Sequence, residues 1–296
     1  MDVLILRDNL LPDHNVNRIE AELLRAGFLC QQVAYSRVLI EVNGAIRFFV
    51  GGQEIEPKIV INWIMNRDLR AYELLKACEV AGLRVVNKAE AWWSAGSDFL
   101  TSLVMYQAEV VHPYAWHAPS GAAVLENQER LEYPLIHLPT GQIGSRSLVQ
   151  IADKNALQAR MKAFVRSQHN LDFQRARESE YLGLVRTIVL GGKAIVACSA
   201  GNPRSQPSTL REWWARRAKN RLALLALNDD FAAKAETAAE ALGLDICCIE
   251  IYQYPDGWEV AGVNCCPNIK QIEDGFGINI AARFAKWVME QIECTV

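Results

Sequence analysis

The chain has 296 residues, of which 51% are apolar and 22% are charged. This composition is ordinary for a globular protein, and the length suggests two or three domains packed together. A net charge of −3 gives no general attraction to nucleic acid or to acidic membranes, so we expect neither as a partner. No apolar run approaches the roughly 20 residues that a membrane-spanning helix needs. The first residues indicate a strand rather than a signal peptide, which predicts a cytoplasmic location.

Residues 1–95 alternate short apolar segments with amphipathic ones. Val3 to Leu6 and Ile59 to Ile61 have the composition of buried strands. A helix between them is expected to end at Gly27. Its apolar face comprises Val16, Ile19, Leu23 and Leu24. Strands that alternate with helices predict a mostly parallel sheet with helices on both faces.

Residues 96–170 begin with a helix that follows Ser97-Asp98. The predicted apolar face of this helix includes Leu100, Leu103 and Val104. Two strands are expected later in the segment, Pro134 to Leu138 and Ser147 to Ile151. A glycine-containing loop joins these two strands, and Asp153 caps the helix that follows them.

Residues 171–296 contain a hairpin, a basic stretch and a second strand pair. The predicted elements are strands at Leu184 to Leu190, Ala194 to Cys198, Asp245 to Tyr252 and Trp258 to Asn264, and helices that begin near Asp229 and Ile278. The turn Gly191-Gly192 joins the first two strands, which is typical of a hairpin.

The eight cysteines include two adjacent pairs, Cys247-Cys248 and Cys265-Cys266, without the C-x-x-C spacing of zinc or redox sites. Neighbouring side chains of a strand point to opposite faces, so one pair does not easily chelate one ion. We therefore expect packed thiols in strands, with a metal or redox role as the alternative. Four histidines show no ligand spacing, and we interpret them as structural: His14, His112, His117 and His169.

Several motifs occur in the order that is found in one known family. They are the loop His137 to Gly144, the segment Val185 to Ala197, Leu242 to Asp245 with Glu250, Val263 to Asn268, Gly275 to Ile278, and the polar residues Asn62, Arg67 and Asn87. This ordered set spans nearly the whole chain and resembles the ATP-grasp ligases, in particular the RimK-like branch, which joins glutamate to carboxylates.

The resemblance implies an α/β protein with the ATP-grasp fold. An N-terminal Rossmann-like pre-ATP-grasp domain would comprise residues 1–95. A central subdomain with the glycine loop would comprise residues 96–170, and a C-terminal subdomain residues 171–296. Both subdomains would be α+β lobes, with a cleft between them.

The resemblance also implies a reaction. Such a ligase transfers the γ-phosphate of ATP to a carboxylate, and an amine then attacks the acyl phosphate, while Mg²⁺, lysine and arginine neutralise charge. Mg²⁺ prefers oxygen ligands, which the family takes from an acid on one strand and from a Glu and an Asn on the next.

Glu250 and Asn264 match the first and last of these ligand positions, and Gly262 occupies the middle one. Residues 260, 262 and 264 share one face of a regular strand, so Glu259 is expected to point the other way unless the strand is bulged. The alternative interpretation of Glu250 is a solvated acid at a strand edge.

The same resemblance predicts how nucleotide would be held. The expected nucleotide-binding residues are His137, Thr140, Gly141, Gln142, Gly144 and Arg186. His137 and Arg186 would also act in catalysis. Where the family has two phosphate-binding lysines this chain has Phe99 and His137, and Leu184 replaces an acid that often precedes the arginine. A neutral imidazole substitutes for a lysine only when protonated, so the implied site is degenerate.

Two of these features also have plain structural interpretations. The glycine loop is alternatively a tight turn between two strands. Arg186 is alternatively an exposed strand arginine that is paired with an acid.

A basic stretch lies where the family has a loop that touches nucleotide and substrate. The residues predicted to bind an anionic substrate are Arg204, Arg211, Arg216 and Arg217. The alternative is a solvated helix face. The implied partner is a carboxylate acceptor, either a small molecule or a protein, and relatives suggest a homodimer or homotetramer.

Two functions are therefore open. The first is an ATP-dependent carboxylate–amine ligase that uses Mg²⁺ and adds glutamate or a similar amino acid to an acidic acceptor. The second is a non-catalytic homologue that has lost ATP binding, needs no cofactor and binds a ligand or a partner. The substitutions at Phe99, His137, Leu184 and Gly262 favour the second, and the retained Arg186, Glu250 and Asn264 favour the first.

Overall fold

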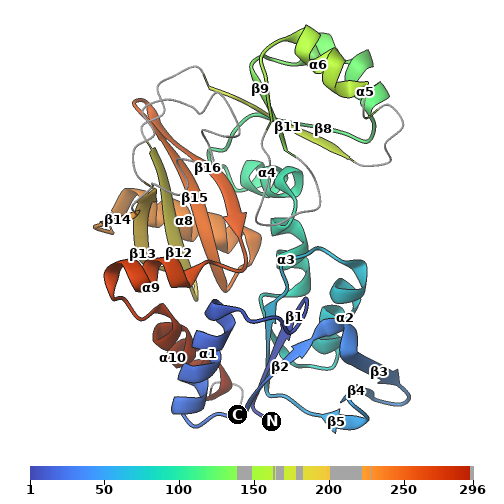
Figure 1. Cartoon of the computed structure of the whole chain (residues 1–296), viewed down its shortest axis with the longest axis vertical. Coiled ribbons are helices and arrows are strands. Elements are labelled where there is room, and N and C mark those ends of the chain that lie inside the picture. Colours follow the sequence, from blue (N-terminus) through green and yellow to red (C-terminus); the bar gives the residue numbers. More distant parts are fainter. Residues whose placement is uncertain are drawn as a thin grey trace.

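The computed structural model describes residues 1–138, 149–162, 164, 170–177, 183–200, 222–227 and 229–293. The described helices and strands form three units, and each unit is built around its own main sheet (Figure 1). The N-terminal unit lies at the bottom of the view, the middle unit at the top, and the C-terminal sheet beside the helices that connect them.

The N-terminal unit contains a parallel sheet in the order β2-β1-β6-β7. Its strands are Cys30–Ala34, Val3–Arg7, Ile59–Trp63 and Arg84–Val86. Alternate residues of β1 pack against helices on opposite faces, Val3 and Ile5 against α1 (His14–Arg25) and Leu4 and Leu6 against α2 (Leu69–Val80). The predicted parallel sheet with two covered faces is confirmed.

The predicted apolar face of α1 is correct except for one residue. Val16, Ile19 and Leu23 are buried, whereas Leu24 is 52% exposed. The helix ends two residues before Gly27, whose φ of 89° is the left-handed conformation that glycine adopts without strain.

A short antiparallel sheet of three strands branches from the N-terminal unit. Its strands are β3 (Val38–Val42), β4 (Ile46–Val50) and β5 (Gln53–Ile55), and the 3-10 turn η1 (Tyr35–Arg37) precedes them. Gly44, with φ of 70°, lies in the turn between β3 and β4.

Helices α3 (Ala89–Ala95) and α4 (Asp98–Gln107) connect the N-terminal unit to the middle unit. Ser97 caps α4, and its side chain accepts a hydrogen bond from the Leu100 amide. The predicted apolar face of α4 is only partly right, because Val104 packs against the core, whereas Leu103 is 45% exposed. The fully buried residues are Thr101, Ser102 and Met105. The periodicity failed here because small polar residues satisfy their hydroxyl groups within the helix or on α3, and so can be buried.

The middle unit contains an antiparallel sheet in the order β10-β9-β11-β8. Its strands are Val149–Ile151, Leu135–Leu138, Leu171–Arg175 and Ala115–Ala118. Helices α5 (Gly121–Glu126) and α6 (Lys154–Met161), with the 3-10 turn η2 (Gln128–Arg130), form a helical layer beside this sheet. Because β11 pairs with β8 and β9, this sheet extends beyond residue 170, where the sequence placed the end of the middle unit.

The C-terminal unit contains an antiparallel sheet in the order β14-β13-β12-β15-β16. Its strands are Leu222–Leu225, Lys193–Ala200, Gly183–Leu190, Ile246–Tyr254 and Gly257–Asn264. Helix α8 (Asp229–Leu242) packs on one face of this sheet. After α9 (Ile269–Phe276), α10 (Ile280–Glu293) returns to pack against α1.

The strand β16 contains a bulge. Glu250 pairs with Gly262 and Ile251 pairs with Val260, so Ala261 is an extra residue without a partner on β15. Because of this extra residue, Glu259 and Val260 point to the faces opposite to those that they would take if β16 were regular up to Gly262 and Asn264.

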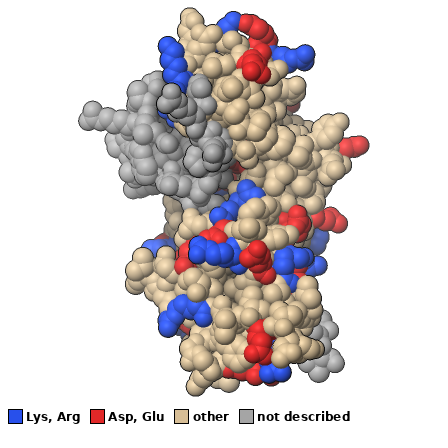
Figure 2. Space-filling view, turned by 90° about the vertical axis from the view of Figure 1, so that its right-hand side faces the viewer, with Lys and Arg blue, Asp and Glu red and all other residues tan. Residues whose placement is uncertain are grey.

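The cysteine pairs are buried as free thiols. Cys247 and Cys248 lie in β15, whereas Cys265 and Cys266 follow the end of β16 and are not in a strand as predicted. In the part of the chain that the structure describes, no helix is long and apolar enough to cross a membrane. On the face shown in Figure 2, the basic side chains lie among acidic ones rather than in a patch of one sign.

Asn87 fixes the C-terminal sheet to the N-terminal one. Its side chain is completely buried, and its Oδ1 accepts hydrogen bonds from the backbone N–H groups of Asp245 and Ile246 at 2.8 and 2.9 Å. Its Nδ2 donates to the carbonyl of Ile246 at 2.8 Å. One amide thus satisfies the backbone at the point where β15 begins.

Replacing Asn87→Ala is expected to lower the free energy of unfolding by about 2–4 kcal/mol, because two buried N–H groups lose their acceptor. Asn66→Ala is the matched control, since this exposed amide donates to Asp8 at the surface. Urea denaturation of both variants measures the difference. Equal stability of the two would contradict the role of Asn87.

Candidate functional site

Arg186 and Glu250 form the centre of the face of the C-terminal sheet that α8 does not cover. They are cross-strand partners on β12 and β15, and Arg186 Nε donates to Glu250 Oε1 at 2.9 Å. The two side chains are 32% and 34% exposed. Burial acts to lower the pKa of Arg186, but the charge and hydrogen bond of Glu250, together with smaller effects of Cys248 and Cys198, raise it overall. The arginine therefore stays charged and is held by an acid.

Gly262 faces Glu250 on the next strand. A Cβ atom at Gly262 would lie 3.8 Å from Glu250 Oε2, and nothing else is within 4 Å. The second carboxylate oxygen of Glu250 therefore leans towards the space that a larger residue at position 262 would fill. A Cβ at position 262 would only be in ordinary van der Waals contact with Glu250, so the space beside this carboxylate is open.

Asn264 lies on the same face as Glu250, because it pairs with Cys248, two residues before Glu250. Its Oδ1 accepts a hydrogen bond from the N–H of Cys266 at 2.9 Å. An amide oxygen has two lone pairs, so this contact orients the side chain and leaves capacity for one more partner.

The expectation for Glu259 changes because of the bulge at Ala261. Glu259 pairs with Tyr252, which shares a face with Glu250, so Glu259 also lies on that face. Arg177 holds it, since Nη1 donates to Glu259 Oε1 at 3.0 Å and the guanidinium lies 4.3 Å from the ring centroid of Tyr254. Burial raises the pKa of Glu259, and Arg177 opposes this effect. Glu259 is thus a paired acid beside the site.

The oxygen donors of Glu250 and Asn264 fit one magnesium ion. A carboxylate and an amide oxygen are ligands that Mg²⁺ accepts. Among the described residues, no group of three acidic, histidine or cysteine side chains is placed to hold a metal. The two side chains would therefore share the ion with phosphate oxygens, as Mg²⁺ sites with nucleotides commonly do.

His137 lies away from this face. Its side chain is 2% exposed and packs against Phe164 and Phe173, at 5.5 and 5.2 Å between ring centroids. Burial, with a smaller effect of Arg160 on α6, lowers the pKa of His137 to about 4. The imidazole is neutral at pH 7 and belongs to the core between the middle sheet and its helices, which does not support the predicted contact with nucleotide.

The next residue of β9 takes the opposite face. Leu138 pairs with Asp172, whereas His137 pairs with Phe173 of the apolar core. Successive residues of a strand alternate in direction, so Leu138, and not His137, is the last side chain on the face away from the helices. Of the two residues at the positions where the family resemblance led us to expect lysines, Phe99 is apolar and His137 is a buried, neutral imidazole.

A polar cluster occupies this second face of the middle sheet. Asp172 is 4% exposed, and its Oδ1 lies 2.6 Å from Nδ1 of His117 on the neighbouring strand β8. Phe99 of α4 stacks on the His117 ring at 4.3 Å and 18°. We expected His117 to be structural, because it shows no ligand spacing. Its partner Asp172 is 55 residues away, so no local pattern of the sequence reveals the pair.

Arg67 approaches the same cluster from the N-terminal unit. Its guanidinium lies 4.2 Å from the ring centroid of Trp93, and a Cβ on Gly96 would be 2.3 Å from its Cδ. Burial lowers the pKa of Arg67, while the charges of Asp172 and Asp98 oppose that effect. Gly96 therefore leaves the space that lets Arg67 reach the two acids.

Several predicted residues lie outside the described part of the chain. They are Thr140, Gly141, Gln142 and Gly144 of the glycine loop, and Arg204, Arg211, Arg216 and Arg217 of the basic stretch. The structure thus brings Arg186, Glu250 and Asn264 together and separates His137 from them.

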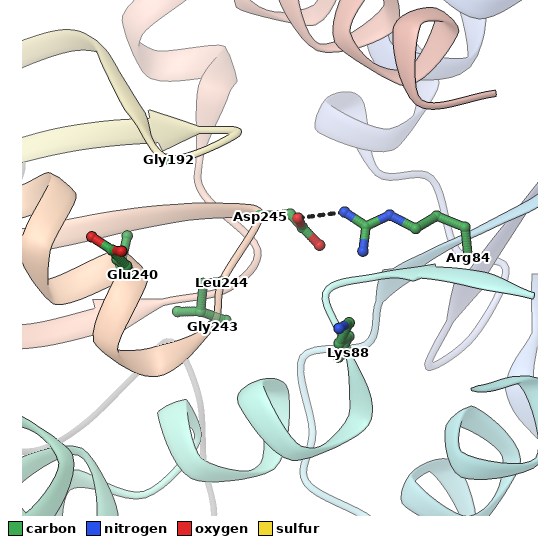
Figure 3. A pocket seen from close by; sticks show the side chains of 8 residues that line it. Arg84, Lys88, Gly192, Glu240, Gly243, Leu244 and Asp245 are labelled. Atoms are coloured by element: carbon green, nitrogen blue, oxygen red, sulfur yellow. Dashed lines mark hydrogen bonds and ion pairs between the residues drawn. The ribbon is translucent and has the colours of Figure 1, made fainter. Parts of the chain in front are cut away.

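A pocket of about 440 Å³ lies elsewhere, at the junction of the N-terminal and C-terminal units. Figure 3 shows Arg84 paired with Asp245, whereas Glu240 lies apart from them on α8. Arg84 Nη2 donates to Asp245 Oδ1 at 2.6 Å. None of the predicted site residues lines this pocket, so we assign it to the interface that Asn87 secures and not to the functional site.

The comparisons with known proteins concern the family and the fold of the chain. A family model described as the RimK-like ATP-grasp domain matches residues 118–288. No curated relative matches the sequence.

Solved structures are similar over nearly the whole chain. The ATP-grasp ligase PsnB, complexed with precursor peptide PsnA2 and AMPPNP, has a TM-score of 0.70 and 17% identity, covering 98% of this chain and 97% of that one. A RimK domain ATP-grasp protein from Sphaerobacter thermophilus DSM 20745 has a TM-score of 0.72 and 14% identity, covering 97% and 99%. A Chryseobacterium gregarium RiPP-associated ATP-grasp ligase, in complex with ADP and a leader and core peptide, has a TM-score of 0.69 and 9% identity, covering 100% and 98%. The predicted ATP-grasp fold is confirmed.

Acidification is expected to weaken the protein through His137. The side chain of His137 binds a proton near pH 6.5 in the unfolded chain, whereas in the folded chain it does so only near pH 4. The stability that this difference contributes is fully present above pH 6.5 and is lost as the pH falls towards 4, by on the order of 2–3 kcal/mol.

Urea denaturation at pH 7 and pH 4.5 tests this expectation. His137→Leu should lose less stability on acidification than the unmodified protein does, and the control His112→Asn should behave as the unmodified protein. An undiminished loss in His137→Leu would show that another group carries the pH dependence.

Proposed function

Because the chain belongs to the RimK-like ATP-grasp family, we propose that it is an ATP-dependent carboxylate–amine ligase. In this proposal ATP is a substrate that phosphorylates an acceptor carboxylate and leaves as ADP. An amino acid such as glutamate then supplies the amine that displaces phosphate.

The observation that carries this proposal is the alignment of Arg186, Glu250 and Asn264 on one exposed face. A cation that stays charged, a carboxylate with an oxygen free of its ion pair and an oriented amide oxygen are the groups that phosphoryl transfer uses. Arg186 would hold phosphate, and Glu250 with Asn264 would hold Mg²⁺, whose charge stabilises that of the transferred phosphoryl group. The glycine loop would add backbone N–H donors.

The proposed acceptor is a carboxylate on a peptide or on an acidic small molecule. PsnB and the Chryseobacterium gregarium ligase were each solved with a peptide, which supports a peptide as the first acceptor to test. The basic residues Arg204, Arg211, Arg216 and Arg217 would attract such an acidic chain.

A second candidate function is a non-catalytic protein that binds a ligand or a partner. The observation that favours it is the lack of charge at two expected phosphate positions, since Phe99 is stacked on His117 and His137 is a buried, neutral imidazole. A hydrogen bond to a charged group contributes roughly 1.5–3 kcal/mol, so the loss of two would weaken nucleotide binding by about 10²–10⁴-fold.

Glu250→Ala and Asn264→Ala are each expected to lower ADP formation by at least on the order of 10²-fold, because each removes a ligand of the ion that stabilises phosphoryl transfer. Glu240→Ala, which removes an exposed acid of the separate pocket, is the control and should retain full activity. ADP release is measured with a glutamate-rich peptide and free glutamate, and circular dichroism checks folding. Full turnover in either site variant would refute the assigned metal site.

Isothermal titration with ATP and with ADP, each with and without Mg²⁺, separates the two candidate functions. The ligase is expected to bind nucleotide in a magnesium-dependent manner, and Asn264→Ala should lose the magnesium dependence. If no binding is detected at millimolar nucleotide, the ligase proposal is refuted and the non-catalytic binding protein is the function that stands.

A further inference from the structure

The contact between His117 and Asp172 fixes the state of the imidazole. An ionised carboxylate only accepts hydrogen bonds, so Nδ1 of His117 carries the hydrogen that bridges the 2.6 Å to Asp172 Oδ1. In the neutral ring Nε2 is then the acceptor. A buried acid that orients a histidine in this way is the arrangement that prepares an imidazole to take up a proton.

The surroundings hold the ring in place without enclosing it. Phe99 covers one ring face, and the His117 side chain remains 26% exposed while that of Asp172 is only 6% exposed. Beside this pair, Arg67 of the N-terminal unit interacts electrostatically with Asp172 on β11 and with Asp98 at the start of α4. Arg67 therefore offsets part of the negative charge next to His117.

Helix α4 links this pair to the C-terminal sheet, because it contacts both β8, which carries His117, and β16, which carries Asn264. Asp98, next to Phe99 in α4, acts with Glu250 on Tyr252 of β15, whose pKa is raised chiefly by burial and further by these acids. His117 and Asn264 therefore lie on strands that pack against the same helix.

We propose that His117 is the general base that takes the proton from the attacking amine, and that Asp172 positions it. This inference rests on the proposed ligase function. The amine nitrogen forms a C–N bond with the carbonyl carbon of the acyl phosphate, the C–O bond to phosphate breaks, and inorganic phosphate leaves with the electron pair. The proton that the nitrogen must lose passes to Nε2 of His117 and from there to solvent.

Other groups near the cleft are less suited to this step. His137 faces the helices of the middle unit and is enclosed by Phe164 and Phe173. Glu259 is engaged by Arg177 and Glu250 by Arg186. His117 combines a free ring nitrogen, an orienting acid and partial exposure.

The test compares two amines in one assay. The unmodified protein, His117→Gln, Asp172→Asn and the control His112→Asn are given ATP, Mg²⁺ and a glutamate-rich peptide, with either glutamate or hydroxylamine as the amine. Hydroxylamine is largely unprotonated at pH 8 and needs little help from a base. With glutamate, His117→Gln is expected to lose on the order of 10²–10⁴-fold in kcat. With hydroxylamine it should form the acyl hydroxamate within about a factor of ten of the unmodified rate.

Asp172→Asn should show an intermediate loss with glutamate and a shifted pH profile, whereas His112→Asn should match the unmodified protein. The tautomer of His117 gives a readout that does not depend on turnover. Nitrogen-15 spectra of the histidine side chains should show His117 protonated at Nδ1, and Asp172→Asn should change that signal.

The outcomes separate this inference from the proposed function. If the unmodified protein binds no nucleotide and forms no product with either amine, the ligase proposal fails and the role of His117 fails with it. If the unmodified protein is active and His117→Gln loses activity equally with both amines, or loses it with neither, the ligase proposal stands and the role of His117 as general base is refuted. A His117 ring protonated at Nε2 would also refute it.

Discussion

The geometry of the site depends on the hydrogen bonds that Asn87 makes to Asp245 and Ile246. These bonds fix the start of β15 against the N-terminal sheet, and the position of Glu250 follows four residues later along the same strand. Glu250 in turn orients Arg186 on β12. A single buried amide is effective because two backbone N–H groups would otherwise have no acceptor, and that cost makes the alternative arrangements unfavourable.

Much of the fold could be predicted from the sequence because its patterns are local. Apolar strands alternating with helices identified the parallel sheet, and glycines marked the ends of α1 and the hairpin turn at residues 191–192. The α4 face could not be predicted, because Thr101 and Ser102 are buried through hydroxyl groups that bond to nearby carbonyls. Periodicity counts apolar residues and does not detect polar residues that are satisfied in place.

The candidate site was harder to predict because one residue of register decides which face a side chain takes. His137 and Leu138 are adjacent in the sequence, yet one lies in the apolar core of the middle unit and the other on the opposite face. The bulge at Ala261 has the same effect on Glu259, and no sequence pattern marks it. Arg186, Glu250 and Asn264 were proposed as site residues because a family motif contains them, and not because their spacing shows that they share one face of the sheet.

The balance of charge in the cleft connects these observations. Among the described residues, three arginines of this region have acidic neighbours, since Arg186 pairs with Glu250, Arg177 with Glu259, and Arg67 faces Asp98 and Asp172. A cleft that binds several phosphate charges needs an excess of cations, whereas a nearly neutral one binds them weakly unless charge is added. Mg²⁺ brought by the nucleotide adds two positive charges, and protonation of His117 would add one more. The two candidate functions therefore differ in one physical respect. The ligase requires that a nucleotide with its bound Mg²⁺ can displace the ion pairs that the arginines of the site now make, whereas the binding protein does not.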